Sequence, residues 1–426
     1  MNVHKNMKAG SEASTIDYEN LIQSDRIHGS LYTRDDVFEE ELEKVFYGNW
    51  VFVGHASEIP AKGDYVSRLI GRESVVMVRG AEEVVNVIVN RCAHRGNMVC
   101  VHPEGSTKFL KCGYHGWIFS LEGDLLDVPF PGGFTKDKGD LGLQTLRTES
   151  YRGFVFASFN PDVVTLDEYL GRAKALIDRS VEMSPTGKID LSAGWVKHKF
   201  GGNWKMLPEN DTDGYHVQFV HSSLPTVLQD SEYVDAISDP DEEIGATTQG
   251  WDGGHAELDF APTYTKPLEW LGTRPDRFPE YLEDMNASYG EELSTKKMTM
   301  GPPHATIWPN LFLGEMNIVI IQPVSANECV QWHTPMLLDG VPEGLNDKFM
   351  RQSEAAMGPS SLLLADDGII SERQQIALTG KSGWLELSRG TEREETTAEG
   401  NIVGRISDEV TNRAFWHHYR DVMSAG

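Results

Sequence analysis

The sequence is poor in cysteine and in cationic side chains. Four cysteines occur in 426 residues: Cys92, Cys100, Cys112 and Cys329. This number argues against a disulfide scaffold and is typical of a protein kept in a reducing compartment. Lysine and arginine total 38 against 65 aspartate and glutamate residues, so the formal net charge is −27. This acidic balance argues against nucleic acid and anionic membranes as partners, because phosphates attract basic surfaces.

Long apolar runs and nucleotide-binding turns are also missing. No run approaches the roughly 18 apolar residues of a membrane span. The first 20 residues are polar and lack the apolar centre of a signal peptide, so we expect a cytoplasmic protein. We find neither a dinucleotide-binding glycine-rich turn nor a flavin site. Any electrons that the chain uses are therefore expected to come from another protein.

Hydrophobic periodicity divides the chain into three parts. Residues 1–47 comprise a polar tail and a helix predicted over 34–47, which we expect to pack on the C-terminal domain. Short β-rich runs between glycine, proline and aspartate predict an all-β domain over 48–160. Residues 161–426 predict an α+β domain, an antiparallel sheet with helices around it. Its strands are expected at 196–200, 304–311, 313–323 and 330–337, and its helices at 165–179, 345–357, 361–378 and 408–423. The acidic stretch 231–296 is left unassigned.

Two motifs in the all-β domain combine cysteine with histidine. Cys92-Ala93-His94-Arg95-Gly96 is followed by Cys112-Gly113-Tyr114-His115-Gly116, with 17 residues between His94 and Cys112. Each motif offers one thiolate and one imidazole. A Rieske [2Fe–2S] centre needs this division, because one iron takes two cysteines and the other takes two histidines. Structural zinc is the alternative, but zinc sites usually pair Cys-x₂₋₄-Cys with His-x₃₋₅-His.

A second histidine motif lies in the C-terminal domain. Four metal-compatible side chains occur within 12 residues: Asn210, Asp213, His216 and His221. Histidines spaced i, i+5 lie about 140° apart on a regular helix. A shared metal therefore requires the segment to distort, or His221 to lie past the helix end. A 2-His-1-carboxylate iron site needs a carboxylate from elsewhere, and Asp366 and Asp367 after an apolar run are the candidates.

In combination, these motifs resemble the large (α) subunit of Rieske non-haem iron aromatic-ring-hydroxylating oxygenases. The resemblance covers residues 30–425, roughly the whole chain. It includes Asn203-Trp204-Lys205, and the order and separation of the motifs agree with the family. The resemblance implies a Rieske β domain beside a helix-grip catalytic domain. It also implies that Cys92 and Cys112 bind one iron of the [2Fe–2S] cluster, and that His94 and His115 bind the other.

The resemblance further implies the ligands of a mononuclear Fe(II), namely His216, His221 and one aspartate of the pair Asp366-Asp367. Asp367 is preferred because the second aspartate of the pair matches the family's ligand. Asn210 would lie close to the iron without binding it tightly. Asp213 would bridge the iron site to a cluster histidine of a neighbouring subunit. Electron transfer between subunits makes a homotrimer the expected assembly, with or without a small β subunit.

The function implied is that of a terminal oxygenase component. The iron would activate O₂ with electrons from the cluster, and the product expected is a cis-dihydroxylated aromatic ring. Monooxygenation and demethylation of an aromatic or small organic substrate are the alternatives. A Rieske electron carrier is a distant alternative, because it would not need the second metal motif. A ferredoxin or a reductase, or both, would donate the electrons, with NADH as the ultimate source.

The substrate is the least defined part of the prediction. We expect a mostly apolar pocket with a few polar anchors. Candidate lining residues are Asn210, Val217, Phe219, Leu224, Ile307, Asn310, Phe312 and Leu363. A carboxylated aromatic would call for a buried cation, and between residues 301 and 323 the candidate is His304. We therefore favour a neutral or phenolic aromatic, with benzoate and salicylate analogues left open.

Overall fold

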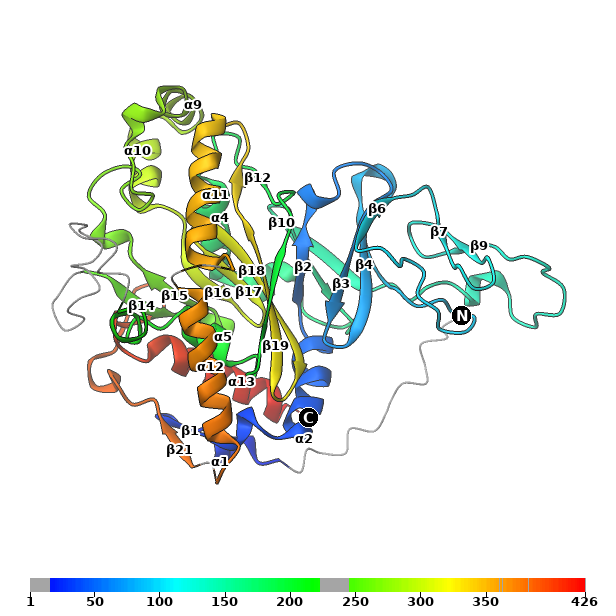
Figure 1. Cartoon of the computed structure of the whole chain (residues 1–426), viewed down its shortest axis with the longest axis horizontal. Coiled ribbons are helices and arrows are strands. Elements are labelled where there is room, and N and C mark those ends of the chain that lie inside the picture. Colours follow the sequence, from blue (N-terminus) through cyan, green and yellow to red (C-terminus); the bar gives the residue numbers. More distant parts are fainter. Residues whose placement is uncertain (1–15, 223–244, 360, 362, 382, 426) are drawn as a thin grey trace. The chain divides into compact units, whose positions relative to one another are not determined.

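A computed structural model describes residues 16–222, 245–359, 361, 363–381 and 383–425. The chain forms two compact units (Figure 1). The first, which we call the β unit, is built on Glu41–Leu166. The second, which we call the α+β unit, contains Tyr18–Glu40 and Asp167–Met423. A segment near the N-terminus therefore belongs to the same unit as the C-terminal half of the chain.

Short strands with apolar residues build the β unit. They form a three-stranded sheet in the order β10-β11-β2, a four-stranded sheet in the order β5-β4-β3-β6 and a three-stranded sheet in the order β7-β8-β9. The strands are β2 (Val51–His55), β3 (Asp64–Ile70), β4 (Glu73–Arg79), β5 (Val85–Val89), β6 (Glu104–Ser106), β7 (Leu110–Lys111), β8 (Ile118–Phe119), β9 (Leu125–Asp127), β10 (Arg147–Tyr151) and β11 (Phe154–Ser158). Short helical turns join them at Leu42–Tyr47, Ala56–Glu58, Ala81–Glu83 and Lys138–Asp140.

Both cysteine–histidine motifs occupy loops of this unit. The first motif follows β5, and the second connects β7 to β8. Cys92, Cys112 and Trp117 are buried in one hydrophobic core with Phe119 and Leu110. The side chains beneath the two loops therefore pack as a single cluster, and this packing holds the loops together.

A nine-stranded antiparallel sheet dominates the α+β unit, in the order β13-β19-β18-β17-β16-β15-β14-β23-β22. Its strands are β13 (Val196–Phe200), β14 (Thr247–Gly250), β15 (Ala256–Asp259), β16 (His304–Ile307), β17 (Leu311–Gly314), β18 (Asn317–Ser325), β19 (Glu328–Pro335), β22 (Glu395–Thr396) and β23 (Ile402–Arg405). Two small pairs add β1 (Arg26–His28) with β21 (Trp384–Glu386) and β12 (Ile189–Asp190) with β20 (Leu337–Leu338).

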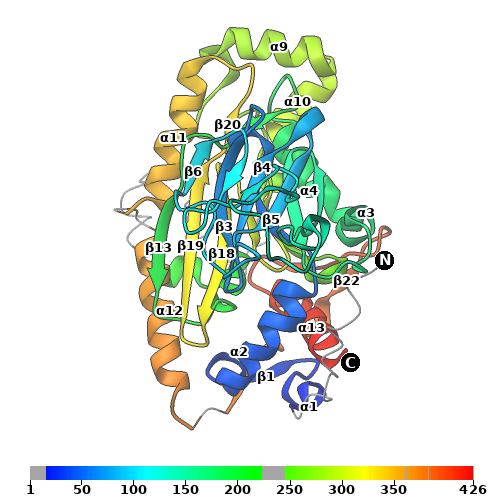
Figure 2. The same cartoon turned by 90° about the vertical axis from the view of Figure 1, so that its right-hand side faces the viewer.

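The α-helices of the chain are α1 (Tyr18–Leu21), α2 (Asp35–Glu41), α3 (Leu166–Leu170), α4 (Lys174–Val181), α5 (Met206–Asp211), α6 (Val217–Val220), α9 (Pro279–Tyr289), α10 (Glu291–Met300), α11 (Glu343–Met357), α12 (Leu364–Leu378) and α13 (Val410–Ser424). Both views show α11 and α12 end to end beside the β13–β19 side of the sheet (Figures 1 and 2). Short 3₁₀ turns complete the unit at Gly29–Tyr32, Gly171–Ala173, Asp252–Gly254, Ala261–Thr263, Pro275–Arg277 and Thr391–Arg393.

The strand register defines one face of this sheet. Directly paired residues of antiparallel strands point to the same side. Pairing therefore aligns one set of side chains: His198, Gln331, His333, Val319, Phe312, Thr306 and His304. We call this the inner face, because helices α5 and α12 lie over it. His304 Nε2 donates to the Asp211 carbonyl of α5 at 2.8 Å, and Phe200 meets Gly368 of α12.

The N-terminal segment of the α+β unit is tied to helix α5. Strand β1 pairs with β21, and the Tyr32 hydroxyl lies 2.8 Å from both carboxylate oxygens of Glu209. The indole N–H of Trp416, on α13, donates to the same carboxylate. Burial raises the pKa of Glu209 to about 7, although the hydrogen bonds from Trp416 and Tyr32 act to lower it. One carboxylate thus joins three segments that are remote in sequence.

The predicted fold class is confirmed, with differences in detail. The region expected as one hairpin, 304–311 with 313–323, contains three strands, because the chain turns at Trp308–Asn310 between β16 and β17. The predicted helix over 34–47 begins as α2 and continues as a π-helical turn over Leu42–Tyr47. The unassigned stretch holds strands β14 and β15 and helices α9 and α10 within its described residues. Among the described residues, no helix is both long enough and apolar enough to cross a bilayer.

Replacing Glu209 with glutamine should change how stability depends on pH. The pKa of Glu209 is about 7 in the folded chain against a reference of 4.5, so the folded state holds the extra proton between these values. Stability from this group is therefore lost as pH rises from 4.5 to 7, at up to about 1.4 kcal/mol per pH unit. The free energy of unfolding of Glu209→Gln, measured in urea, should therefore rise relative to that of the unchanged protein as the pH increases from 4.5 to 7. Parallel stability curves for the two proteins would contradict this.

Candidate functional site

The two cysteine–histidine loops have matching backbones. In the first, the Gly96 amide donates to the Cys92 carbonyl at 2.9 Å, and in the second, the Gly116 amide donates to the Cys112 carbonyl at 3.0 Å. Gly96 and Gly116 both have φ of +73°, a conformation that glycine adopts without steric cost. Each loop therefore closes into the same tight turn and presents its cysteine and histidine in a similar way.

The imidazoles of the two loops face each other. The ring centroids of His94 and His115 lie 4.4 Å apart, and the indole of Trp117 stacks on His94 at 4.9 Å with 3° between the planes. The Nδ1 atom of His94 is buried without a hydrogen-bond partner. The imidazole can therefore offer this nitrogen to a metal without breaking a bond within the chain.

The two thiols have different electrostatic surroundings. Burial raises the pKa of Cys92. At Cys112 burial acts in the same direction, but amide N–H groups of Tyr114 and His115 outweigh it and lower the pKa. Amide donors directed at sulfur favour the thiolate that iron binds. The buried thiols outside the loops differ, because burial raises the pKa of Cys100 to about 11 and that of Cys329 to about 12. These donors and their pairing fit a Rieske cluster.

The segment between the two histidines of the second motif is very short. Helix α6 spans Val217–Val220, and His216 precedes it with helical backbone angles. His221 has φ −96° and ψ 37°, so the helix ends before it. Of the two alternatives, a distorted segment or His221 past the helix end, the structure shows the second. This turn of the chain brings the two imidazole centroids to 5.3 Å.

One carboxylate lies between these imidazoles. The Asp367 Oδ1 atom is 3.2 Å from His221 Nε2 and 3.6 Å from His216 Nε2. One ligand atom from each residue lies within 4.8 Å of the other two. Asp366 has a different position: its Oδ2 is 3.7 Å from the opposite ring nitrogen of His221, and its side chain is 39% exposed. Two nitrogens and one carboxylate oxygen converging at this range fit a 2-His-1-carboxylate metal site.

Two polar side chains surround this triad. Asn210 Nδ2, at the end of α5, lies 3.4 Å from His216 Nε2 and 3.3 Å from Asp367 Oδ1. Asp213 Oδ2 lies 3.3 Å from the other ring nitrogen of His216. Burial acts to lower the pKa of His216, but Asp213 and then Asp367 outweigh it, so the pKa is raised. A carboxylate at Nδ1 holds the proton there and leaves Nε2 free for a metal.

A folded segment, 387–413, packs against the turn that carries Asp213. The guanidinium carbon of Arg389 lies 4.3 Å from the ring centroid of Tyr215, while Arg389 Nε donates to the Ser407 carbonyl at 2.9 Å. A side chain at Gly214 would meet the Ile406 carbonyl at 2.4 Å. This close approach explains the glycine between Asp213 and Tyr215, and it fixes the turn from outside.

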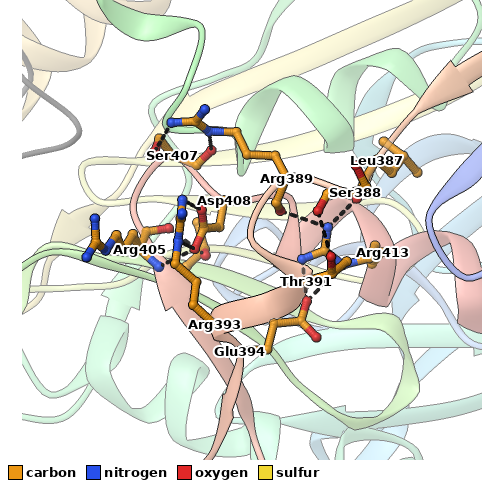
Figure 3. Close-up of polar contacts among 11 residues, drawn as sticks. Leu387, Ser388, Arg389, Thr391, Arg393, Glu394, Arg405, Ser407, Asp408 and Arg413 are labelled. Carbon is orange, nitrogen blue, oxygen red and sulfur yellow. Dashed lines mark hydrogen bonds and ion pairs between the residues drawn. The ribbon is translucent and has the colours of Figure 1, made fainter.

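Ion pairs that include the buried Asp408 and Arg413 give this segment its own rigidity. Asp408 accepts from Arg393 Nε at 3.0 Å and from the Arg405 amide at 2.9 Å. Arg413 Nε donates to Glu394 at 2.8 Å, and Arg413 also donates to the main-chain carbonyls of Leu387 and Arg389. Figure 3 shows these contacts joining the two ends of the segment.

The predicted substrate-lining residues are spread over several environments. Phe312 lies on the inner face, whereas Ile307 points to the opposite face of the sheet. Val217 and Leu363 are partly buried, Asn310 is buried, and Phe219 is 65% exposed. Leu224 lies outside the described residues. Burial lowers the pKa of His304 to about 4, so this histidine is neutral near pH 7 and supplies no cation.

The sequence-based prediction passed over two polar residues of β19. Gln331 and His333 are buried on the inner face. The pattern that could have identified them is their spacing of two residues in the run Val330-Gln331-Trp332-His333-Thr334, because residues two apart lie on the same side of a strand. That alternation is also typical of a solvent-facing strand, so it did not stand out before the strand order was known.

The fold and its two metal-compatible sites define the class of Rieske non-haem iron oxygenases. Comparison with known proteins supports this. The family model described as the Rieske [2Fe-2S] domain matches residues 49–146, and the model described as the ring-hydroxylating alpha subunit (catalytic domain) matches residues 191–425. The chain belongs to the family of ring-hydroxylating oxygenase alpha subunits. It is an oxygenase that carries a Rieske [2Fe–2S] cluster and a mononuclear iron.

Individual relatives are similar over most of their length. The chain is 29% identical to the anthranilate 1,2-dioxygenase large subunit of Acinetobacter baylyi, over 92% of this chain and 86% of that protein. It is 28% identical to the N,N-dimethyl phenylurea N-demethylase subunit alpha of a Sphingobium species, over 91% of this chain and 89% of that protein. A naphthalene 1,2-dioxygenase variant bound to phenanthrene shares the fold, with a TM-score of 0.83, 24% identity and 96% of each chain covered.

The matching loop glycines lead to a testable difference among variants. Gly96→Ala and Gly116→Ala should each cost about 1–2 kcal/mol, because the alanine must adopt a left-handed conformation. Both variants should therefore bind less cluster, measured as acid-labile sulfide and visible absorbance per chain. Gly113→Ala is the matched control, since its added carbon would meet no atom within 4 Å and its φ is not positive. Equal sulfide content in all three variants would contradict the argument.

Proposed function

We propose that this chain is the terminal oxygenase subunit that cis-dihydroxylates an aromatic ring. The convergence of His216, His221 and Asp367 within 4.8 Å, in a chain that also has the paired cysteine–histidine loops, is the observation that carries the proposal. A mononuclear iron with open positions activates O₂ once electrons reach it, which is the chemistry that this ligand type supplies.

In this proposal each metal group has a defined set of ligands. Cys92 and Cys112 hold one iron of the cluster, and His94 and His115 hold the other. His216, His221 and Asp367 hold the mononuclear iron. Asn210 stays within reach of two of these ligands, at 3.4 and 3.3 Å, and restricts where they can move. Asp366 remains outside this set because it approaches the opposite nitrogen of His221.

Asp213 acts as a positioning residue in this proposal. Its carboxylate holds the proton on His216 Nδ1 and accepts the Tyr215 amide at 2.7 Å through its other oxygen. The same carboxylate would connect His216 to a cluster histidine of a neighbouring copy. This role requires a homotrimer, which a small β subunit could accompany.

Electrons reach the cluster from a separate ferredoxin or reductase, with NADH as their ultimate source. Large apolar side chains exposed on the β unit support such a docking surface. Phe130 is 92% exposed and Tyr114 is 55% exposed, and Tyr114 directly precedes His115. Exposed apolar groups around a redox loop favour contact with a partner protein.

The ligand set predicts different outcomes for the two adjacent aspartates. Asp367→Asn should weaken iron binding at the mononuclear site by more than the roughly 10–100-fold that outer-shell changes cost. Asp366→Asn is the matched control and should keep its iron. Iron in excess of acid-labile sulfide, measured per chain, separates mononuclear iron from cluster iron. Loss of the excess iron in Asp366→Asn alone would reverse the assignment.

Asp213→Asn belongs in the same experiment. It should retain both the sulfide and the excess iron but lose turnover, because the proton on His216 and the link between subunits both depend on the carboxylate. Turnover at the level of the unchanged protein would remove Asp213 from the proposal.

A single turnover tests the proposed reaction. The purified protein is reduced without a partner and exposed to ¹⁸O₂ with a panel of neutral and carboxylated aromatics. We expect one product with two labelled oxygen atoms. One labelled atom, or loss of a methyl group, would instead support the monooxygenase or demethylase alternative, which the resemblance to a demethylase subunit favours. No oxygenated product from any aromatic would contradict the proposed function.

A further inference from the structure

Two buried polar side chains and a partly buried histidine lie together on the inner face of the sheet. His198 on β13 is directly paired with Gln331 on β19, and His333 is two residues further along β19. His333 is 0% exposed and Gln331 is 1% exposed. The imidazole rings of His198 and His333 stack with centroids 5.3 Å apart and 12° between their planes. We call these three residues the inner-face polar cluster.

Several polar atoms of this cluster have no hydrogen-bond partner. They are His198 Nε2, Gln331 Oε1, His333 Nδ1 and His333 Nε2. Burying a polar group without a partner costs roughly 1–3 kcal/mol. The cluster therefore weakens the fold in the absence of a ligand, and an apolar residue would serve stability better at each position.

The cluster is connected to the helix that carries Asp367. Gln331 Nε2 contacts the Met357 sulfur at 4.0 Å, and Met357 ends α11, just before the segment that leads into α12. Phe200, two residues after His198 on β13, packs against Gly368. Gly368 directly follows Asp367. A cavity of about 340 Å³ between β13 and α12 borders His198, Phe200, Leu364 and Gly368. The cluster thus lies close to the part of α12 that approaches the metal site.

Met357 occupies the place next to Gln331 that a ligand would take. A thioether is a weak acceptor and a flexible side chain that repacks easily. An oxygen or nitrogen substituent of a ligand could displace it and make stronger hydrogen bonds. A flexible side chain therefore lies where a ligand substituent could contact Gln331.

The tautomer of His198 indicates what kind of group would bind. Burial lowers the pKa of His198, and its ring donates to the Met357 carbonyl. A neutral ring that donates from one nitrogen has a lone pair on the other, so Nε2 can accept. Gln331 Oε1 is a second acceptor. Burial and His198 lower the pKa of His333 to about 4, so it too is neutral near pH 7 and cannot balance a carboxylate.

We propose that His198, Gln331 and His333 bind a neutral hydrogen-bond-donating substituent, a hydroxyl or an amino or amide N–H, on the aromatic substrate. This inference rests on the proposed function, which it makes more specific. The unpartnered acceptors His198 Nε2 and Gln331 Oε1 face such a donor, and the neutral His333 ring adds one N–H and one lone pair. A carboxylate or an ether offers no hydrogen to the two acceptors and leaves both unpaired.

Equilibrium binding to the holoenzyme tests the proposal without turnover. The ligands are naphthalene, 2-naphthol, 2-methoxynaphthalene and 2-naphthoate, of which 2-naphthol alone is a neutral donor. The unchanged protein should bind 2-naphthol about tenfold more tightly than 2-methoxynaphthalene, the effect of about one buried hydrogen bond. Gln331→Leu and His333→Phe should each reduce that ratio toward one.

Thr334→Val is the matched control. Thr334 neighbours His333, is 0% exposed and has an unpartnered hydroxyl, but it pairs with Ile318 and points to the opposite face. It should leave the binding ratio unchanged. Because the cluster atoms lack partners, Gln331→Leu should melt at the same temperature as the unchanged protein or higher. A lower melting temperature with an unchanged ratio would assign the cluster a structural role instead.

The outcomes separate this inference from the proposed function. If the unchanged protein shows no preference for 2-naphthol, or prefers 2-naphthoate, the inference is overturned, whatever the protein oxygenates. If no aromatic is oxygenated in the single-turnover experiment, the proposed function fails, while the binding ratio still reports on the cluster.

Discussion

The structure depends on holding one carboxylate between two imidazoles. Asp367 Oδ1 lies 3.2 and 3.6 Å from the nearest nitrogens of His221 and His216, and the aspartate comes from a segment far along the chain. A carboxylate held this close to imidazole lone pairs is costly, unless a cation joins them. Packing elsewhere must therefore keep α6 and the first turn of α12 in place, and the surrounding contacts can be understood as that support.

The support comes from two directions. From inside the unit, Glu209 is held by Tyr32 and Trp416, which fixes the helix that carries Asn210. From outside, segment 387–413 covers the Asp213–His216 turn, with Gly214 in close contact with Ile406. Both supports use polar groups that are paired with each other, so they orient the ligands without adding an unpaired charge near the metal. The precision of the site thus comes from residues that bind no metal.

The proposed metal ligands could be predicted from the sequence better than the residues that support them. Cysteine and histidine at this fixed spacing are typical of metal ligands. The geometric problem of His216 and His221 on one helix left two solutions, a distorted segment or His221 past the helix end, and the structure shows the second. The short turn at Trp308–Asn310 was missed because apolar residues run on through it and hide the break between β16 and β17. The link between Tyr32 and Glu209 could not be predicted, because it joins residues 177 positions apart and no local pattern reports such a contact.

Selectivity in this fold can follow from where buried polar groups are left without partners. A sheet face lined by apolar residues would bind many aromatics with little discrimination, since area burial depends weakly on the substituent. A buried acceptor changes this. A ligand that lacks a donor leaves the acceptor unpaired, and its binding free energy is weakened by the full cost of burying that acceptor. Gln331 and His333 therefore lower the stability of the empty fold, and the same cost becomes discrimination when a ligand binds. Burial lowers the pKa of both His304 and His333 to about 4, so neither ring supplies a positive charge to a bound carboxylate near pH 7.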